Sequence, residues 1–167
     1  LHVWFSRTGA PPDGRRLGVN YAESEATLER SRLNYPDFLV FDLDSYVYSG
    51  KEAKGAEPEL HRKGFNRVRE LAHEVRQIAE SVGLRVFVKT SGRTGLHLYA
   101  PIVRRFTFDE ARAMAETIGW FLSARRPKDV TLEWAVEKRA GKVFFDYNQN
   151  VRGKSLAAAF SPRRHAQ

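Results

Sequence analysis

The sequence predicts an α+β fold in which helices cover one face of an antiparallel sheet. From Phe38 onward, its segments follow the order strand, helix, strand, strand, helix, strand, with one additional strand near Leu132. This order is the split βαβ arrangement, in which the first strand lies between the third and the fourth. Apolar residues recur every three or four positions in the two predicted helices, whereas β-branched and aromatic residues dominate the predicted strands.

The first strand is expected at Phe38–Asp44, where a run of β-formers follows Pro36. A helix follows it, because Pro58 suits the first turn of a helix and Gly83 suits its C-terminal cap. Apolar side chains at steps of three and four form one face of that helix: Val68, Leu71, Val75, Ile78 and Val82.

A hairpin and a second helix are expected next. Residues 84–90 and 96–102 are two β-rich runs on either side of a glycine-bearing turn at 91–95, so they are expected to pair. Thr107 and Glu110 have the spacing of a capping box, which predicts that the second helix begins there.

Pro127 is expected to close the second helix. Two further strands are predicted at 130–136 and 142–147, joined by a charged turn at 138–141. Residues 23–33 are highly charged and are expected to be a short exposed helix or a linker. Together these segments predict a sheet of the RNA-recognition-like type.

The composition limits the possible functions. The 167 residues include 42% hydrophobic residues, which is enough for one domain with a real core. Lys and Arg number 28 and Asp and Glu 20, so the net charge of +8 favours a polyanionic partner, with nucleic acid first. Without cysteine, the chain has no disulfide scaffold, thiolate zinc site or cysteine nucleophile. No apolar run is long enough to cross a membrane.

Acidic and polar residues are predicted to converge on the face opposite the helices. Asp42 and Asp44 share one face of the first strand, and His97 and Asp146 are expected on the neighbouring strands. Three carboxylates repel one another unless a cation neutralises them, and oxygen ligands suit Mg²⁺ or Mn²⁺. A pair of such ions is a known device for phosphoryl transfer between nucleotides.

Each of these signals also has an ordinary structural interpretation. An Asp-x-Asp at a strand end is often a turn or a solvated edge, and a Gly-x-x-Gly turn such as 92–95 is usually only a hairpin. A single histidine such as His97 is more often packed or hydrogen-bonded than functional. The expected convergence of these groups in a basic chain is what favours the functional interpretation.

Four segments, taken in order, resemble the motifs of the archaeo-eukaryotic primase superfamily. Within it, the chain is similar to the polymerase domain of bacterial ligase D and to archaeal end-joining primase-polymerases. The resemblance covers residues 36–163 and rests on FDLD at 41–44, KTSGRTGLHLY at 89–99, VFFDYNQN at 143–150 and SPR at 161–163. The segment LHVWFSR, which contains His2, is also similar to the His-x-Trp segment of that family.

The resemblance implies a primase-type fold and a template-dependent nucleotidyltransferase that uses two Mn²⁺ or Mg²⁺ ions. It implies addition of nucleotides, with ribonucleotides preferred, to DNA ends in non-homologous end joining. Asp42, Asp44 and Asp146 would hold the metals. The nucleotide-binding residues that it implies are Ser91, Gly92, Arg93, His97 and Arg163, with Lys89 and Gln149 in matching motif positions.

The implied partners are DNA ends and primer-template, nucleoside triphosphates, Ku and a DNA ligase, without a membrane. The implied location is the bacterial or archaeal cytoplasm, at the nucleoid. We expect one primase-polymerase catalytic domain over 1–167, with an N-terminal extension at 1–35 and a motif-bearing core at 36–163. The family also has a substantial region before its His-x-Trp segment, so the resemblance implies that an N-terminal part of the family fold is missing here.

The chain departs from the family pattern at Thr94, where many relatives carry lysine. Arg93 is expected to supply the positive charge instead. Several further basic residues are candidates for contacts with a phosphodiester backbone, although surface lysines and arginines often serve only solubility. They are Arg104, Arg105, Arg125, Arg126, Lys138, Arg139, Lys142, Arg152 and Lys154.

Two other function classes stay open. One is a noncatalytic nucleic-acid-binding module, which would present aromatic residues rather than carboxylates on the exposed face of the sheet. The other is a metal-dependent nuclease, which the carboxylate cluster also allows. Primer extension separates the three classes, because a polymerase lengthens the primer, a nuclease shortens it and a binding module leaves it unchanged.

Overall fold

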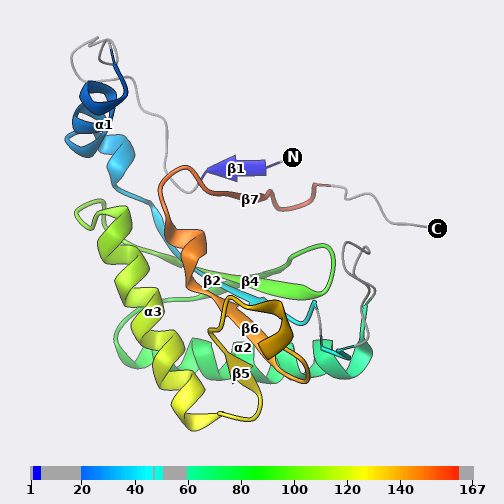
Figure 1. The fold of residues 1–167 in the computed structure, drawn as a ribbon. Coiled ribbons are helices and arrows are strands. Elements are labelled where there is room, and N and C mark those ends of the chain that lie inside the picture. Colours follow the sequence, from blue (N-terminus) through cyan, green and yellow to red (C-terminus); the bar gives the residue numbers. More distant parts are fainter. Residues whose placement is uncertain (1, 5–19, 47, 51–59, 162–167) are drawn as a thin grey trace.

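The computed structural model describes residues 2–4, 20–46, 48–50 and 60–161 of the chain. Its elements are β1 (His2–Trp4), α1 (Tyr21–Glu29), β2 (Phe38–Asp44), α2 (Arg62–Ser81), β3 (Phe87–Thr90), β4 (Gly95–Pro101), α3 (Phe108–Arg125), β5 (Val130–Thr131), β6 (Val143–Asp146) and β7 (Ser155–Ala157) (Figure 1). Three 3-10 turns join them: η1 (Arg32–Asn34), η2 (Val136–Lys138) and η3 (Tyr147–Asn150). Within these described residues, no helix is both long and apolar enough to cross a membrane.

The predicted α+β class and sheet order are confirmed. The main sheet has five strands in the order β3-β4-β2-β6-β5. The central strand β2 pairs antiparallel with β4 on one side and with β6 on the other. This is the split βαβ arrangement, with the first predicted strand between the third and the fourth. The capping box at Thr107 and Glu110 is also present and begins α3.

The strand predicted at 130–136 is too long. β5 contains only two residues, and it runs parallel to β6 in a sheet that was expected to be antiparallel. It ends early because the Thr131 hydroxyl accepts a hydrogen bond from the Glu133 amide at 3.1 Å, after which the chain turns into η2.

Two predicted strand boundaries also shift. Leu84 is not in β3, because its amide donates to the Ala79 carbonyl at 2.9 Å and completes the cap of α2. Gly83 makes that cap possible with a φ of 84°, which favours glycine. The last strand ends at Asp146 and not at 147, because the Asp146 carboxylate accepts from the Asn148 amide and starts η3.

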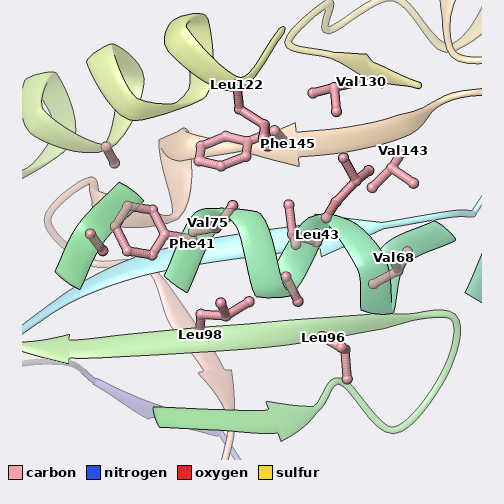
Figure 2. Packing of buried hydrophobic residues seen from close by; sticks show 14 of the residues in the cluster. Phe41, Leu43, Val68, Val75, Leu96, Leu98, Leu122, Val130, Val143 and Phe145 are labelled. Atoms are coloured by element: carbon pink, nitrogen blue, oxygen red, sulfur yellow. The ribbon is translucent and has the colours of Figure 1, made fainter. Parts of the chain in front are cut away.

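One face of the sheet carries the core. Phe41 and Leu43 of β2 point to this face and pack with Phe145 of β6, where α2 and α3 cover them (Figure 2). On the opposite face, Val40 packs with Leu156 of β7 in a smaller cluster. The helices therefore cover one face as predicted, and β7 covers one end of the other.

The pairing of β1 with β7 was not predicted. These two strands form a separate antiparallel ribbon in which His2 lies opposite Ala157 and Trp4 opposite Ser155 (Figure 1). Three-residue strands carry too little sequence pattern to be recognised. The ribbon ties the predicted N-terminal extension to the C-terminal part of the predicted core.

Replacement of Gly119 by alanine is expected to lower the free energy of unfolding. A Cβ atom at this position of α3 would lie 2.8 Å from Phe145 Cδ1 and 3.0 Å from Leu132 Cδ2. Such overpacking costs about 1–3 kcal/mol, whereas the better helix propensity of alanine returns about 1 kcal/mol at most. Chemical denaturation measures the difference.

The control Thr117→Ala, at an exposed position of the same helix, is expected to change stability by less than about 0.5 kcal/mol. A Gly119→Ala protein more stable than its parent would contradict this packing.

Candidate active site

Three strands bring four of the predicted site residues to one face of the sheet. In the register of the sheet, Asp42 lies directly opposite His97 of β4 and Asp146 of β6. Residues directly opposite one another on neighbouring strands share a face, so these three side chains are neighbours. Asp44 follows two residues later in β2 and therefore points to the same side.

Burial of the apolar residues explains this orientation. Phe41, Leu43 and Phe145 are all 0% exposed beneath the two helices. Because side chains alternate along a strand, this burial forces the acidic residues of β2 and β6 to the opposite side. The helical core thus decides where the carboxylates lie.

Asp42 and His97 form the centre of the site. His97 Nε2 lies 3.6 Å from Asp42 Oδ1, and the His97 side chain is only 4% exposed. Tyr99 lies two residues further along β4, on the same face. Burial and the Asp42 carboxylate together raise the pKa of the Tyr99 hydroxyl to about 12. Tyr99 therefore stays protonated and can serve as a hydrogen-bond donor at neutral pH.

Thr94, where the chain departs from the pattern of the similar family, holds Asp44 in place. The Thr94 hydroxyl donates to Asp44 Oδ1, and the Ser45 hydroxyl donates to the Thr94 carbonyl at 2.7 Å. Burial raises the pKa of the Asp44 carboxyl, and the Thr94 hydrogen bond opposes that rise. Thr94 therefore orients Asp44 without neutralising its charge.

Asp146 is oriented by the turn that follows it. Its Oδ1 accepts from the Asn148 amide at 2.9 Å, and its Oδ2 accepts from Gln149 Nε2 at 3.1 Å. Burial raises the pKa of this carboxyl, and both hydrogen bonds oppose the rise. Gln149 is thus brought to the site as a direct contact of Asp146.

Asn150 is a supporting residue that the sequence motifs do not predict. Its side-chain amide accepts from the Val40 amide and donates to the Val40 carbonyl, both at 2.8 Å, and it is buried. The side chain thereby replaces one rung of the ladder between β2 and β6, where η3 has interrupted β6. The partners are 110 residues apart, so no local pattern could have revealed the contact.

The predicted phosphate turn lies beside Asp44, because Gly95 is the cross-strand partner of Asp44. Ser91 Oγ accepts from the Arg93 amide at 3.2 Å and from the Gly95 amide at 3.0 Å, which closes the turn. Gly92 has a φ of 84°, a conformation that favours glycine.

Lys89 lies opposite His97 in the register of β3 and β4. Its ammonium group donates to the Thr90 carbonyl at 2.8 Å. The structure therefore places Lys89 on the same face as the carboxylates, one strand further from Asp42.

Arg139 adds a positive charge to the site, whereas the sequence predicts this residue only as part of the basic surface. Its guanidinium carbon lies 3.5 Å from the centroid of the Phe144 ring, and Phe144 is the cross-strand partner of Asp44. Burial lowers the pKa of the guanidinium, and the charges of Asp146 and Asp44 oppose that change. Arg139 thus partly balances the charge of the two carboxylates.

The donor set fits hard divalent cations, although the side chains are not closed around one. Asp42, Asp44 and Asp146 offer carboxylate oxygens from adjacent strands. Mg²⁺ and Mn²⁺ prefer oxygen ligands of this kind. Among the described residues, no three acidic or histidine side chains are already gathered closely enough to hold an ion. Arg163, the remaining predicted site residue, lies outside the described residues.

Several of the predicted DNA-binding cations are engaged within the chain. Arg104 forms a two-point ion pair with Asp37, at 2.7 and 3.0 Å. Three others form ion pairs of their own: Arg126 with Glu74, Lys138 with Glu133 and Arg152 with Glu25. These partners offset part of the positive charge on which contact with a phosphate backbone depends.

The chain is similar to known proteins over the region that contains the candidate site. The family model described as "LigD, primase-polymerase domain" matches residues 1–167. The multifunctional non-homologous end joining protein LigD of Pseudomonas aeruginosa is 36% identical over 140 residues, which are 84% of this chain and 14% of that protein. LigD of Mycolicibacterium smegmatis is 38% identical over 94 residues, or 56% of this chain and 12% of that protein.

A solved structure supports the same relationship. The polymerase domain of Mycobacterium tuberculosis ligase D, in complex with DNA, matches with a TM-score of 0.63 and 32% identity, over 77% of this chain and 40% of that one. The sequence motifs, the sheet order and these similarities lead to one assignment. The chain belongs to the LigD primase-polymerase domain family.

Proposed function

We propose that the chain catalyses template-dependent transfer of nucleotides from nucleoside triphosphates to the 3′ end of a primer strand. The observation that carries this proposal is the gathering of Asp42, Asp44 and Asp146 on one face of adjacent strands, with His97 beside them. The reaction is an in-line attack of the primer 3′-oxygen on the α-phosphate, and pyrophosphate leaves.

The substrate class follows from the family and the charge. The related polymerase domain of M. tuberculosis was solved in complex with DNA, and the relatives are non-homologous end joining proteins. The net charge of +8 favours contact with a polyanion. We therefore propose DNA ends with an annealed template as the primer. From the family resemblance alone, we further propose ribonucleoside triphosphates as preferred substrates and Ku and a DNA ligase as partners.

Asp42, Asp44 and Asp146 would hold two Mn²⁺ or Mg²⁺ ions. Bound there, the ions would supply charge neutralisation at the triphosphate and a lower pKa for the primer hydroxyl. Thr94 and Gln149 keep Asp44 and Asp146 in fixed orientations, so less reorganisation is needed when ligands bind.

The residues around the carboxylates would bind the triphosphate. His97, on β4, and the turn formed by Ser91, Gly92 and Arg93 lie on the side of β2 away from β6. His97 and Arg163 are proposed to donate to the departing phosphates, and Lys89 is proposed to add positive charge. Preorganised donors of this kind stabilise the charge that develops during transfer.

Asp42→Asn and Asp146→Asn are each expected to abolish primer extension, because each removes a metal ligand. Binding of a duplex is expected to change little, since neither substitution removes a phosphate-binding cation. Extension of a labelled primer-template with Mn²⁺ or Mg²⁺ measures the activity of each variant and of the parent protein.

Asp109→Asn is the matched control, because Asp109 is exposed on α3 and lies outside the site. It is expected to retain full extension. Metal-dependent shortening of the primer would replace the proposal with a nuclease, and binding without any change in length would replace it with a noncatalytic module. Full extension by Asp42→Asn would refute the carboxylate mechanism.

His97→Ala is expected to raise the KM for the nucleotide by about 10- to 150-fold, because a charge-assisted hydrogen bond contributes about 1.5–3 kcal/mol. Steady-state extension at varied nucleotide concentration measures the change. His73→Ala, an exposed histidine of α2 on the helical side of the sheet, is the control and is expected to leave KM unchanged. An unaltered KM in His97→Ala would remove His97 from the nucleotide site.

Asp44→Asn is expected to stabilise the metal-free protein at neutral pH. Burial raises the pKa of Asp44 above its ordinary value of 3.8, so the folded state holds the proton more tightly than the unfolded chain. This contribution to stability is complete below pH 3.8 and is lost as pH rises through the raised pKa. Asparagine does not ionise, so the difference in Tm between Asp44→Asn and the parent should shrink as the pH falls. A difference that does not vary with pH would contradict the burial of a charged Asp44.

A further inference from the structure

Trp134 is unusually exposed for a large aromatic residue. It lies in the connection between β5 and β6, three residues after β5 ends, and 61% of its surface is accessible. Single exposed apolar residues are common and need no explanation in themselves. The surroundings of Trp134 are what distinguish it.

Contacts to its main chain and to its indole ring both hold Trp134 in place. The Arg139 guanidinium donates to the main-chain carbonyls of Trp134 and, at 3.1 Å, of Glu133. The same guanidinium lies 5.6 Å from the centroid of the Trp134 ring. The ring also meets Phe144 in an edge contact, with centroids 5.9 Å apart and planes at 73°. Trp134 is therefore an anchored aromatic surface.

This surface adjoins the carboxylates. Phe144 is the cross-strand partner of Asp44, and it points to the same face of the sheet as the acidic residues. Arg139 lies within the electrostatic influence of Asp146 and Asp44. The three residues Trp134, Arg139 and Phe144 thus form a shelf of two aromatic rings and one cation at the border of the candidate active site.

We propose that Trp134 is a stacking platform for a nucleobase at this border. The inference rests on the proposed nucleotidyl transfer and adds a base-binding residue to it. A flat, anchored indole offers a π-face that stacks on any base, which suits a template-directed enzyme that must accept all four. The adjacent Arg139 charge favours the phosphate of the same nucleotide. The stacked base belongs either to the incoming nucleotide or to the unpaired template strand.

Tryptophan fluorescence tests this proposal directly, because stacking on a nucleobase quenches an indole. The chain has three tryptophans, and Trp120 on α3 supplies the matched control with 59% exposure on the helical side. Trp134→Phe and Trp120→Phe proteins are titrated in Mg²⁺ with ATP, with single-stranded oligo(dA), and with inorganic tripolyphosphate, which has no base. Quenching is expected with ATP or oligo(dA) in Trp120→Phe and is expected to be absent in Trp134→Phe.

The two nucleotide probes distinguish the sources of the base. Quenching by ATP assigns the platform to the incoming nucleotide, and quenching by oligo(dA) assigns it to the template strand. Trp134→Ala should weaken binding of the probe that causes quenching by about 5- to 150-fold. Trp134→Phe should lose far less affinity for that probe, because it retains an aromatic face. Trp120→Ala should leave this affinity unchanged.

Equal quenching in Trp134→Phe and Trp120→Phe would overturn the platform, as would quenching by tripolyphosphate as strong as that by ATP. No quenching by either base-containing probe would overturn it as well. An active polymerase with an unquenched Trp134 would refute the platform alone and leave the proposed function intact. Quenching that depends on Trp134 in a protein without transfer activity would support the platform and refute the proposed function.

Discussion

The alternation of apolar and acidic residues in β2 governs how the sheet, its helices and the candidate site are arranged. β2 is the central strand, so both of its edges pair with neighbouring strands, and its two faces carry different side chains. Phe41 and Leu43 are buried beneath α2 and α3, and burial of each such side chain contributes about 1.5–3 kcal/mol. A shift of register by one residue would expose this pair and bury Asp42 and Asp44 in the core. The hydrophobic core therefore fixes the direction of the carboxylates more strongly than any contact between them.

The acidic face carries an energetic cost that its neighbours reduce. Burial raises the pKa of Asp44 and of Asp146, so each carboxylate is less stable in its charged form than it would be in water. Hydrogen bonds from Thr94 and Gln149 and the charge of Arg139 offset part of this cost. A cation that binds there would offset more. Active sites commonly lower the stability of the folded protein in this way when no ligand is bound.

The short connection between β5 and β6 links the scaffold to the site. β5 and β6 run parallel, so the chain must cross back from the end of β5 to the start of β6. Residues 132–142 make this crossing. Arg139 reaches from this return toward Asp44 and Asp146, and it fixes Trp134 on the way. The Gly141 amide donates to the Tyr48 carbonyl at 2.8 Å, which ties the same segment to the turn that follows β2. A connection expected to be a plain charged turn thus becomes part of the wall of the site.

The sequence alone predicts the fold class, the bounds of β2, the capping box of α3 and the set of acidic residues, because these follow from local periodicity and from motifs. It also determined the family, since four motifs in order are far more specific than any one of them. It did not determine the two-residue β5 and its parallel pairing, the ribbon of β1 and β7, or the roles of Asn150 and Arg139. Those depend on contacts between distant residues, such as the one that joins Asn150 to Val40 across 110 positions. Local propensity carries no information about such partners, so only the packed tertiary structure decided them.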